Sequence, residues 1–432
     1  MRLCILGGGG FRVPLVYAAL AGDDGGVTEV TLHDTDAVRL RAVRAVLAGI
    51  GGGPPVRVAD GLDDALRDAD FVFCAIRAGG TAGRVHDERT ALAEGVLGQE
   101  TVGAGGLLYG LRTVPVARDI AQRVRTLAPR AWVVNFTNPA GMVTEAMADV
   151  LGERVIGICD SPVGLVRRAA RAAGADPDAV EPDYLGLNHL GWLRSLTRDG
   201  HDLLPGLLAD PRALNSFEEG RLFGAEWLAT LGALPNEYLH YYYFRRETLA
   251  AVRAAAETRG EFLARRQGAF FDRAARDPKA APALWEAARR EREETYLADA
   301  RAASGGWRRD AHDLDGGGYD RVALALMRAI ADDRRTRLIL NVRNAGTVPA
   351  LPPDAVIETV CAVDGSGARP LPGAPLGPAE LGLVLQVKAS EQAAVEAATS
   401  GSRRAALRAL ALHPLVDSPA VAERVLVRSH QL

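Results

Sequence analysis

The sequence predicts an α/β protein with a Rossmann-like, doubly wound parallel sheet followed by an α+β C-terminal domain. Over the first 165 residues, short apolar runs alternate with helical patterns of roughly 10–20 residues, as in parallel sheets covered on both faces. The first apolar run leads into a glycine-rich turn, which is typical of such folds. After about Arg167 longer helices dominate. We therefore expect one domain at 1–165 and a second at 166–432.

Composition narrows the classes of protein. The chain has 432 residues and a net charge of −3, so it lacks the basic character typical of nucleic-acid binding. It contains no apolar run of the roughly 18 residues that a membrane span needs, and its first residues lack the apolar core of a secretion signal. The four cysteines lie far apart without a CxxC pair, which suits buried thiols in a reducing compartment. We expect a cytoplasmic protein without nucleic-acid or membrane partners.

The first elements form a strand, turn, helix and strand that suit a dinucleotide. Leu3–Leu6 and Glu29–His33 read as strands, with a helix from about Leu15 between them. Glycines let the backbone approach a pyrophosphate, and a carboxylate after the second strand accepts from a ribose hydroxyl. The third glycine of GxGxxG is absent, so a tight turn in an ordinary α/β domain remains the alternative. The residues predicted to hold NAD here are Gly7, Gly8, Gly9, Gly10 and Asp34.

Further strands place polar residues along one edge of the sheet. The predicted strands are 57–59, 71–75, 132–135 and 155–158, and helices at 62–67, 108–126 and 144–150 fill the gaps. Ligands bind beyond the carboxyl ends of parallel strands. The residues expected at this edge are Gly7, Asp34, Arg77, Asn135, Asn138, Cys159 and Asp160.

Two glycine-rich loops carry charged residues between them. The loop at 76–89 contains Arg77 and Arg84, and the loop at 98–106 contains Glu100. Arginines in a glycine-rich loop suit an anionic ligand, whereas a mobile connection is the plainer interpretation. Two such loops in succession favour a ligand.

Two short apolar runs each end in a polar pair. The first ends in Cys159 and Asp160, and the second ends in Asn188 and His189. Cysteine and histidine bind first-row divalent metals once deprotonated. Either residue alone is more often a buried core residue, so the metal interpretation depends on the two lying together.

Aromatic residues gather once in the second half, at 234–244. On a helix, Tyr238, Tyr241 and Tyr242 would share one face, with core packing as the plainer explanation. Loops are expected at Gly316–Gly318, strands at 336–342 and 355–363, and helices over 379–430 with breaks near Gly401 and His413.

Together these motifs resemble the NAD- and metal-dependent family 4 glycoside hydrolases, in particular their 6-phospho-β-glucosidase branch. The resemblance runs from Leu3 to about Leu415. Its specific parts are Gly7–Gly10, Arg77-x-Gly-Gly-x-x-x-Arg84, Gly98-Gln-Glu-Thr101, Asn135-Phe-Thr-Asn-Pro139, Ile158-Cys-Asp160, Gly186-Leu-Asn-His189 and Tyr238-Leu-x-Tyr-Tyr242.

The resemblance implies glycoside cleavage by a redox route, an exception to the mechanism with two carboxylates. NAD⁺ takes hydride from C3 of the sugar, which acidifies the C2 proton, and a tyrosinate removes that proton. The metal stabilises the enediolate. The C1–O bond then breaks by elimination, water adds to C1, and NADH returns the hydride. The nucleotide is needed but not consumed.

The resemblance also implies a role for each matching residue. Cys159 and His189 hold the metal, most simply Mn²⁺, and Tyr238 is the base, with Glu100 raising its basicity. Asp160 matches an acid that protonates the leaving oxygen in the α-type branch. The residues implied for the substrate are Arg84, Asn138, Asn188 and Arg259, of which Arg259 helps to hold the 6-phosphate, and those implied for NAD include Arg77 and Asn135.

Some features depart from the β-type pattern. Many β-type members have asparagine where Asp160 stands, and the loop at Gly316 lacks the arginine that many members carry before it. A 6-phospho-α-glucosidase is therefore one alternative, and a lactate/malate-type dehydrogenase or an inactive NAD-binding protein are others. The expected substrate is a phosphorylated disaccharide or aryl glucoside, and the expected assembly is a homodimer or homotetramer with an interface at 379–430.

Overall fold

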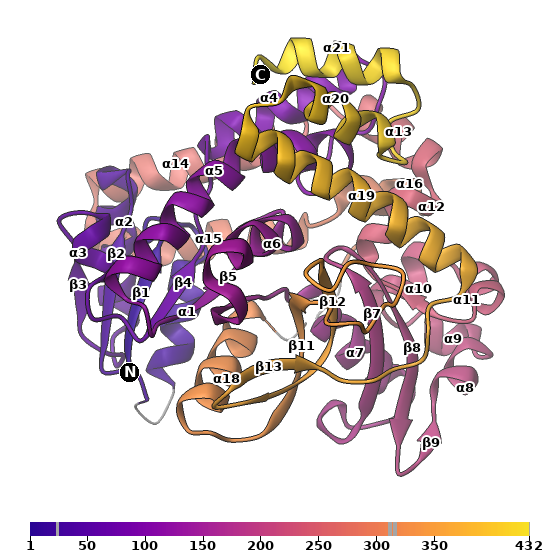
Figure 1. Cartoon of the computed structure of the whole chain (residues 1–432), viewed down its shortest axis with the longest axis horizontal. Helices are drawn as coiled ribbons and strands as arrows, with labels where there is room; N and C mark the ends of the chain where they lie inside the picture. The colour runs from indigo at the N-terminus through magenta and orange to yellow at the C-terminus, as the bar shows by residue number, and fades with distance from the viewer. Residues whose placement is uncertain (23–25, 310–312, 314–317, 432) are drawn as a thin grey trace.

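The computed structural model describes residues 1–22, 26–309, 313 and 318–431, which form a 13-stranded sheet covered by helices (Figure 1). Six strands of the first half pair in parallel in the order β3-β2-β1-β4-β5-β6, which is the Rossmann order. They are β1 Arg2–Leu6, β2 Glu29–His33, β3 Val56–Val58, β4 Phe71–Cys74, β5 Trp132–Asn135 and β6 Val155–Gly157. The predicted fold class is confirmed.

Helices join these strands. They are α1 Val13–Ala21, α2 Ala37–Ile50, α3 Leu62–Leu66, α4 Gly80–Ala93, α5 Gly103–Leu127 and α6 Ala140–Leu151. The helix predicted from Leu108 begins at Gly103, because its glycines serve close packing rather than a loop. A Cβ at Gly105 would lie 2.2 Å from the carbonyl oxygen of Gln99.

The second half extends the same sheet with antiparallel strands. The strand pairing that joins it to the first half is that of Asn341 in β11 with Gly157 in β6. The sheet then continues through β12, β7, β8 and β10. The predicted boundary at residue 165 lies inside α7, Ser161–Ala172. The added strands are β7 Glu181–Leu187, β8 Leu190–Arg198, β9 His201–Asp202, β10 Leu234–Pro235, β11 Thr336–Arg343, β12 Val356–Asp364 and β13 Gly367–Pro370.

Helices of the second half of the chain pack against helices of the first half. The second half contains α14 Arg259–Arg276, α15 Ala281–Glu294 and α16 Ala298–Ala303, and the first two contact α2. The breaks predicted near Gly401 and His413 are confirmed, since they separate α19 Pro378–Ser400, α20 Arg403–Leu412 and α21 Pro419–Ser429. These three helices lie across α4 and α5 (Figure 1). Gly316 and Gly317 of the predicted loop lie outside the described residues.

Smaller helices complete the described part of the chain. They are α8 Leu204–Leu208, α9 Pro211–Leu214, α10 Glu218–Phe223, α11 Ala225–Leu231, α12 His240–Tyr243, α13 Arg245–Ala254 and α18 Tyr319–Ala331. Within the described ranges, we find no helix with the length and apolar character needed to cross a membrane.

Aromatic contacts anchor the second half beside the glycine turn. The ring of Phe11 packs edge-on against Phe270 of α14, with centroids 5.6 Å apart. Trp285 of α15 donates its indole N–H to the carbonyl oxygen of Phe11 at 2.8 Å. This packing buries apolar rings and satisfies the indole group, so α14 and α15 are held over the edge where the parallel strands end.

Candidate active site

A cavity of about 1320 Å³ opens at the carboxyl ends of the parallel strands, between the two halves. The predicted common edge is confirmed, because Leu6 pairs in register with His33 and Cys74, and Asn135 pairs with Gly157. Of the predicted site residues, Gly8, Asn135 and Asn188 are absent from the cavity lining. Those that line it are Gly7, Gly9, Gly10, Asp34, Arg77, Arg84, Glu100, Asn138, Cys159, Asp160, His189, Tyr238 and Arg259.

The glycine turn and Asp34 form one end of the cavity. Gly7 has φ +80°, and a Cβ there would lie 2.4 Å from the carbonyl oxygen of Ala75, so only glycine fits without strain. The N–H of Gly9 donates to Asp34 Oδ2 at 2.8 Å, and the N–H of Asp36 donates to Oδ1 at 2.9 Å. The carboxylate is therefore held beside the turn, where it suits a ribose hydroxyl.

Two asparagines predicted to contact ligands do not line the cavity. The amide of Asn135 donates to Thr144 Oγ1 at 3.0 Å, and that of Asn188 donates to Glu358 Oε1 at 3.1 Å. Asn138 differs, since it lines the cavity and its buried Oδ1 has no hydrogen-bond partner among the described residues. A buried acceptor without a partner costs free energy unless a ligand satisfies it.

Cys159 and His189 lie side by side in the cavity lining. Cys159 follows β6, and His189 lies in the turn between β7 and β8 with φ +63°. The Sγ and Nε2 atoms are 3.6 Å apart, and both side chains are buried. With metal bonds of roughly 2.3 Å to sulfur and 2.0–2.1 Å to nitrogen, two ligands of one ion lie about 3.1–3.6 Å apart. The pair therefore fits a divalent cation.

The protonation of this pair also suits a metal. Burial lowers the pKa of His189 to about 4, which leaves the imidazole neutral and able to ligate. Burial, together with Glu358, raises the pKa of the Cys159 thiol, so metal binding must displace its proton. No cluster of three or more His, Cys, Asp and Glu side chains suited to a metal occurs within the described ranges. Any further ligands would come from outside this pair.

Glu358 is a buried carboxylate that the sequence analysis missed. It lies inside β12 and accepts from Tyr184 at 3.1 Å and from Asn341 at 2.9 Å, besides Asn188. The sequence feature that could have indicated this residue is a charged side chain inside the apolar run Val356–Val363, where burying an unpaired charge would cost free energy. Burial raises its pKa to about 7, although three hydrogen bonds oppose the shift.

Glu358→Gln is expected to stabilise the metal-free protein much more at pH 8 than at pH 5. The folded-state pKa of about 7 exceeds the ordinary 4.5, so stabilisation present below pH 4.5 is lost as pH rises through 7. The full loss is about 3 kcal/mol. Glutamine carries no charge, so the variant does not undergo this loss of stability. Urea unfolding of both proteins at the two pH values measures this, and an equal difference at both would contradict the assignment.

Tyr238 lies directly on His189. The two rings stack with centroids 3.8 Å apart and an interplanar angle of 13°. The predicted single helix face is wrong, because Glu237–Leu239 form a 3₁₀ turn before α12 begins at His240. Pro235 belongs to β10, and the Asn236 side chain caps this tighter turn by accepting from the N–H of Tyr238.

Two residues that the sequence motifs do not single out, Tyr296 and Glu237, form a polar contact next to the Tyr238 hydroxyl. The hydroxyl of Tyr296 lies 3.0 Å from that of Tyr238 and 3.2 Å from Glu237 Oε1. Burial, reinforced by Glu237, raises the pKa of Tyr238 above its ordinary value. The phenol is therefore protonated at neutral pH in the ligand-free protein, and a nearby cation is needed to lower its pKa. Tyr296 has no motif around it in the sequence.

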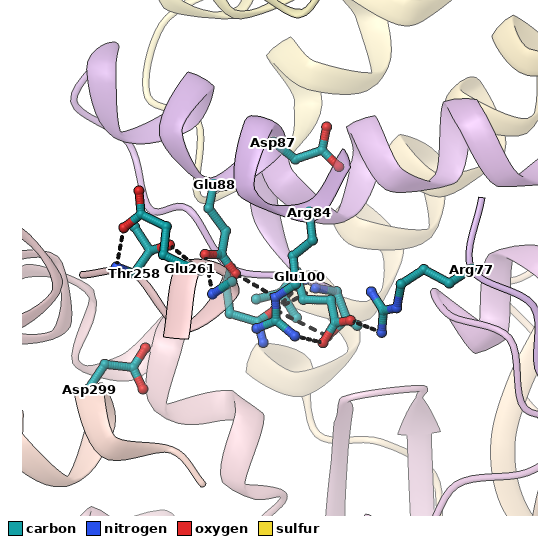
Figure 2. A network of polar contacts seen from close by, with 12 residues as sticks. Arg77, Arg84, Asp87, Glu88, Glu100, Thr258, Glu261 and Asp299 are labelled. Carbon is teal, nitrogen blue, oxygen red and sulfur yellow. Dashed lines mark hydrogen bonds and ion pairs between the residues drawn. The ribbon is translucent and has the colours of Figure 1, made fainter. Parts of the chain in front are cut away.

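Charged residues from α4 and from the segments around Arg77 and Glu100 form a network at the cavity wall. The loop predicted at 76–89 is wrong from residue 80 onward, because Arg84 and Glu88 belong to α4. Arg84 donates through Nε to Glu88 at 2.7 Å and through Nη1 to Glu100 at 2.6 Å, and Arg77 pairs with Glu100 (Figure 2). Burial would raise the pKa of Glu100, but the two arginines outweigh it and hold the pKa far below its usual range. Its oxygens meet arginines and not the Tyr238 hydroxyl, so its predicted effect on Tyr238 stays a prediction.

Arg259 reaches the cavity from the start of α14. It donates through Nη1 to Thr295 Oγ1 at 2.7 Å and through Nη2 to the carbonyl oxygen of Arg292 at 2.8 Å. Glu88 joins this helix to α4, because its Oε2 accepts from the N–H of Gly260 at 2.7 Å (Figure 2). Arg84 and Arg259 are thereby held at one cavity, which suits an anionic ligand.

The fold and the cavity define a class: a Rossmann-type protein with a metal-binding pair, a stacked tyrosine and an arginine cluster. The model for "Family 4 glycosyl hydrolase" matches residues 3–175, and that for "Family 4 glycosyl hydrolase C-terminal domain" matches residues 184–416. The chain belongs to family 4 of the glycosyl hydrolases, as the resemblance predicted.

Relatives with both anomeric preferences are similar to this chain. A probable 6-phospho-β-glucosidase of Bacillus subtilis (strain 168) is 34% identical over 87% of this chain and 81% of its own. A structure of the 6-phospho-β-glucosidase from Thermotoga maritima with NAD and glucose-6-phosphate covers 99% of this chain and 97% of its own, with 26% identity and a TM-score of 0.82. A 6-phospho-α-glucosidase from gut microorganisms, in complex with NAD and Mn²⁺, has the same coverages and identity and a TM-score of 0.78.

Proposed function

We propose that this enzyme hydrolyses 6-phospho-β-glucosides by the redox elimination and addition route, with NAD and Mn²⁺ bound in the cavity. The observation that carries the proposal is Tyr238 stacked on His189 beside Cys159. This group lies in the same cavity as the glycine turn and the arginine cluster. The names and ligands of the similar glucosidases support the same substrate class and cofactors.

The chain offers a place for each cofactor. The backbone of the glycine turn precedes α1, where helix N–H groups favour a pyrophosphate, and Asp34 suits the ribose. Cys159 and His189 would hold the metal. When bound, NAD⁺ supplies a reversible hydride acceptor for C3 of the sugar, and the metal supplies Lewis acidity that acidifies the C2 proton.

The side chains of the cavity divide the remaining work. Tyr238 removes the C2 proton, with its phenol ring oriented by stacking on His189 and by the Tyr296 hydroxyl. Asn138 Oδ1 accepts from a sugar hydroxyl, which satisfies that buried oxygen. Arg84 and Arg259 bind the 6-phosphate, for which guanidinium groups are well suited.

Different features of the chain favour the β-anomer and the α-anomer of the substrate. The motifs at Asn188–Trp192 and Tyr238–Tyr242 favour the β-type branch. Asp160 favours the α-type, because it lines the cavity beside Cys159 and can protonate a leaving oxygen there. Its carboxylate lies 3.7 Å from Arg12, and both side chains are about one-third exposed, so the ion pair does not hold Asp160 firmly. An α-glucoside is therefore the second candidate substrate.

A chromogenic assay tests the proposal directly. Nitrophenyl 6-phospho-β-glucoside, its α-anomer and the unphosphorylated β-glucoside are compared with and without NAD⁺ and Mn²⁺. We expect turnover only of a phosphorylated substrate and only with both cofactors, with the β-anomer faster. NADH should not accumulate, which separates this route from a dehydrogenase. Equal kcat/KM with and without the phosphate, or full activity after removal of nucleotide and metal, would contradict the proposal.

A further inference from the structure

Arg292 is a cavity residue that neither the sequence motifs nor the proposed roles use. It lies in the last turn of α15, and its side chain is half-buried in the cavity lining. Its carbonyl oxygen accepts the hydrogen bond from Arg259, so the two arginines are direct neighbours. Among the described residues, the Arg292 guanidinium has no hydrogen-bond or ion-pair partner, whereas Arg77 and Arg84 both pair with Glu100.

The surroundings of Arg292 are electropositive. Burial lowers its pKa, and repulsion from Arg12, Arg259 and Arg84 lowers it further, while Glu100 opposes the shift. Desolvation and repulsion by Arg84 likewise lower the pKa of Arg259 to about 10. An arrangement in which buried cations repel one another weakens the ligand-free fold, and the binding of an anion relieves it.

The charged side chains around Arg292 have a net positive charge. Arg77, Arg84, Arg259 and Arg292 carry four positive charges, and Glu88 and Glu100 carry two negative charges. Arg12 and Asp299, which also act on this group, carry one charge of each sign, so two positive charges are in excess. A phosphate monoester carries about −1.5 to −2 charges at pH 7. The excess therefore matches one phosphate dianion. Without Arg292 the excess falls to a single charge.

We propose that Arg292 binds the phosphate of the sugar substrate together with Arg84 and Arg259, and so sets the preference for phosphorylated glucosides. The inference deepens the proposed function and rests on it. Five N–H donors in a planar fork give an unpaired guanidinium the capacity for a bidentate contact with phosphate. Two N–H groups of Arg259 already donate hydrogen bonds to Thr295 and to the Arg292 carbonyl oxygen. The N–H groups of Arg292 therefore have more capacity to bind the phosphate.

Arg292→Met removes the charge and keeps most of the side-chain volume. Calorimetric titrations with glucose 6-phosphate, inorganic phosphate and NAD⁺ are compared for wild type, Arg292→Met and Arg292→Lys. The control is Arg290→Met, on the same helix, where the side chain is 70% exposed and pairs with Glu286. We expect Arg292→Met to lose about tenfold to a hundredfold in affinity for both phosphates, with Arg292→Lys intermediate.

Two further readouts separate binding from structure. The affinity for NAD⁺ is expected to stay unchanged, and the melting temperature of ligand-free Arg292→Met is expected to rise, because repulsion is removed. The control should match wild type throughout. Unchanged glucose 6-phosphate affinity, or a loss confined to NAD⁺, would overturn the role of Arg292. If wild type itself does not bind glucose 6-phosphate, the proposed function fails as well.

Discussion

Replacing Tyr238 with phenylalanine is expected to lower kcat by about 10²–10⁴-fold, the usual cost of losing a general base. The substitution removes the hydroxyl oxygen that accepts the C2 proton and keeps the ring that stacks on His189. Steady-state kinetics with saturating NAD⁺ and Mn²⁺ measure the loss.

The fold should tolerate this change. Tyr296 can still donate to Glu237, which lies 3.2 Å away, so no buried donor is left unsatisfied. The melting temperature and the affinity for NAD⁺ should stay near wild type. Tyr242→Phe is a matched control, because Tyr242 packs near His413 outside the cavity lining. If Tyr238→Phe kept near-normal kcat, another residue would be the base, and Asp160 would be examined next.

Cys159→Ser is expected to weaken Mn²⁺ binding by more than the ~10–100-fold typical of losing a hydrogen-bond partner of a ligand. A serine hydroxyl keeps its proton at neutral pH and cannot replace a thiolate. Turnover should fall at low Mn²⁺ and recover in part at high Mn²⁺. Titration of the metal-free enzyme with Mn²⁺ measures the affinity and the activity together.

Another buried thiol separates a metal role from packing. Cys361 lies inside β12, where its thiol contacts the carbonyl oxygen of Thr359 at 3.4 Å. Cys361→Ser should leave the Mn²⁺ requirement unchanged, whatever it does to stability. EDTA should abolish wild-type activity, and added Mn²⁺ should restore it. An unaltered Mn²⁺ affinity in Cys159→Ser would show that Cys159 is a core residue only.

The sequence predicts the nucleotide half well because its signals are local. The strand at Glu29–His33 is confirmed residue for residue, and the polar edge follows from the rule that parallel strands end together. Cys159 and His189, 30 residues apart, could be paired only through the family resemblance, and the structure places them 3.6 Å apart. The order of the motifs along the chain thus indicates which residues lie together in the site, and hydrophobic periodicity alone does not.

The missed features depend on long-range contacts. Glu358 and Tyr296 matter through partners far along the chain, such as Tyr184 and Tyr238. The apolar run around Glu358 indicates only that this residue is buried, and no local pattern marks Tyr296. The continuous sheet depends on a single pairing between Asn341 and Gly157. The oligomeric state stays a prediction. Among the described residues, large exposed apolar side chains such as Val427 of α21 are few and far apart in the sequence.

The fate of the C2 hydrogen tests the central claim most directly. Hydrolysis is run in D₂O, and the glucose 6-phosphate formed is analysed for deuterium by NMR. The redox route predicts deuterium at C2, together with slower turnover of substrate that carries deuterium at C2, since the C2–H bond breaks. Product without deuterium at C2, and equal rates for the two substrates, would contradict the account and indicate direct displacement at C1.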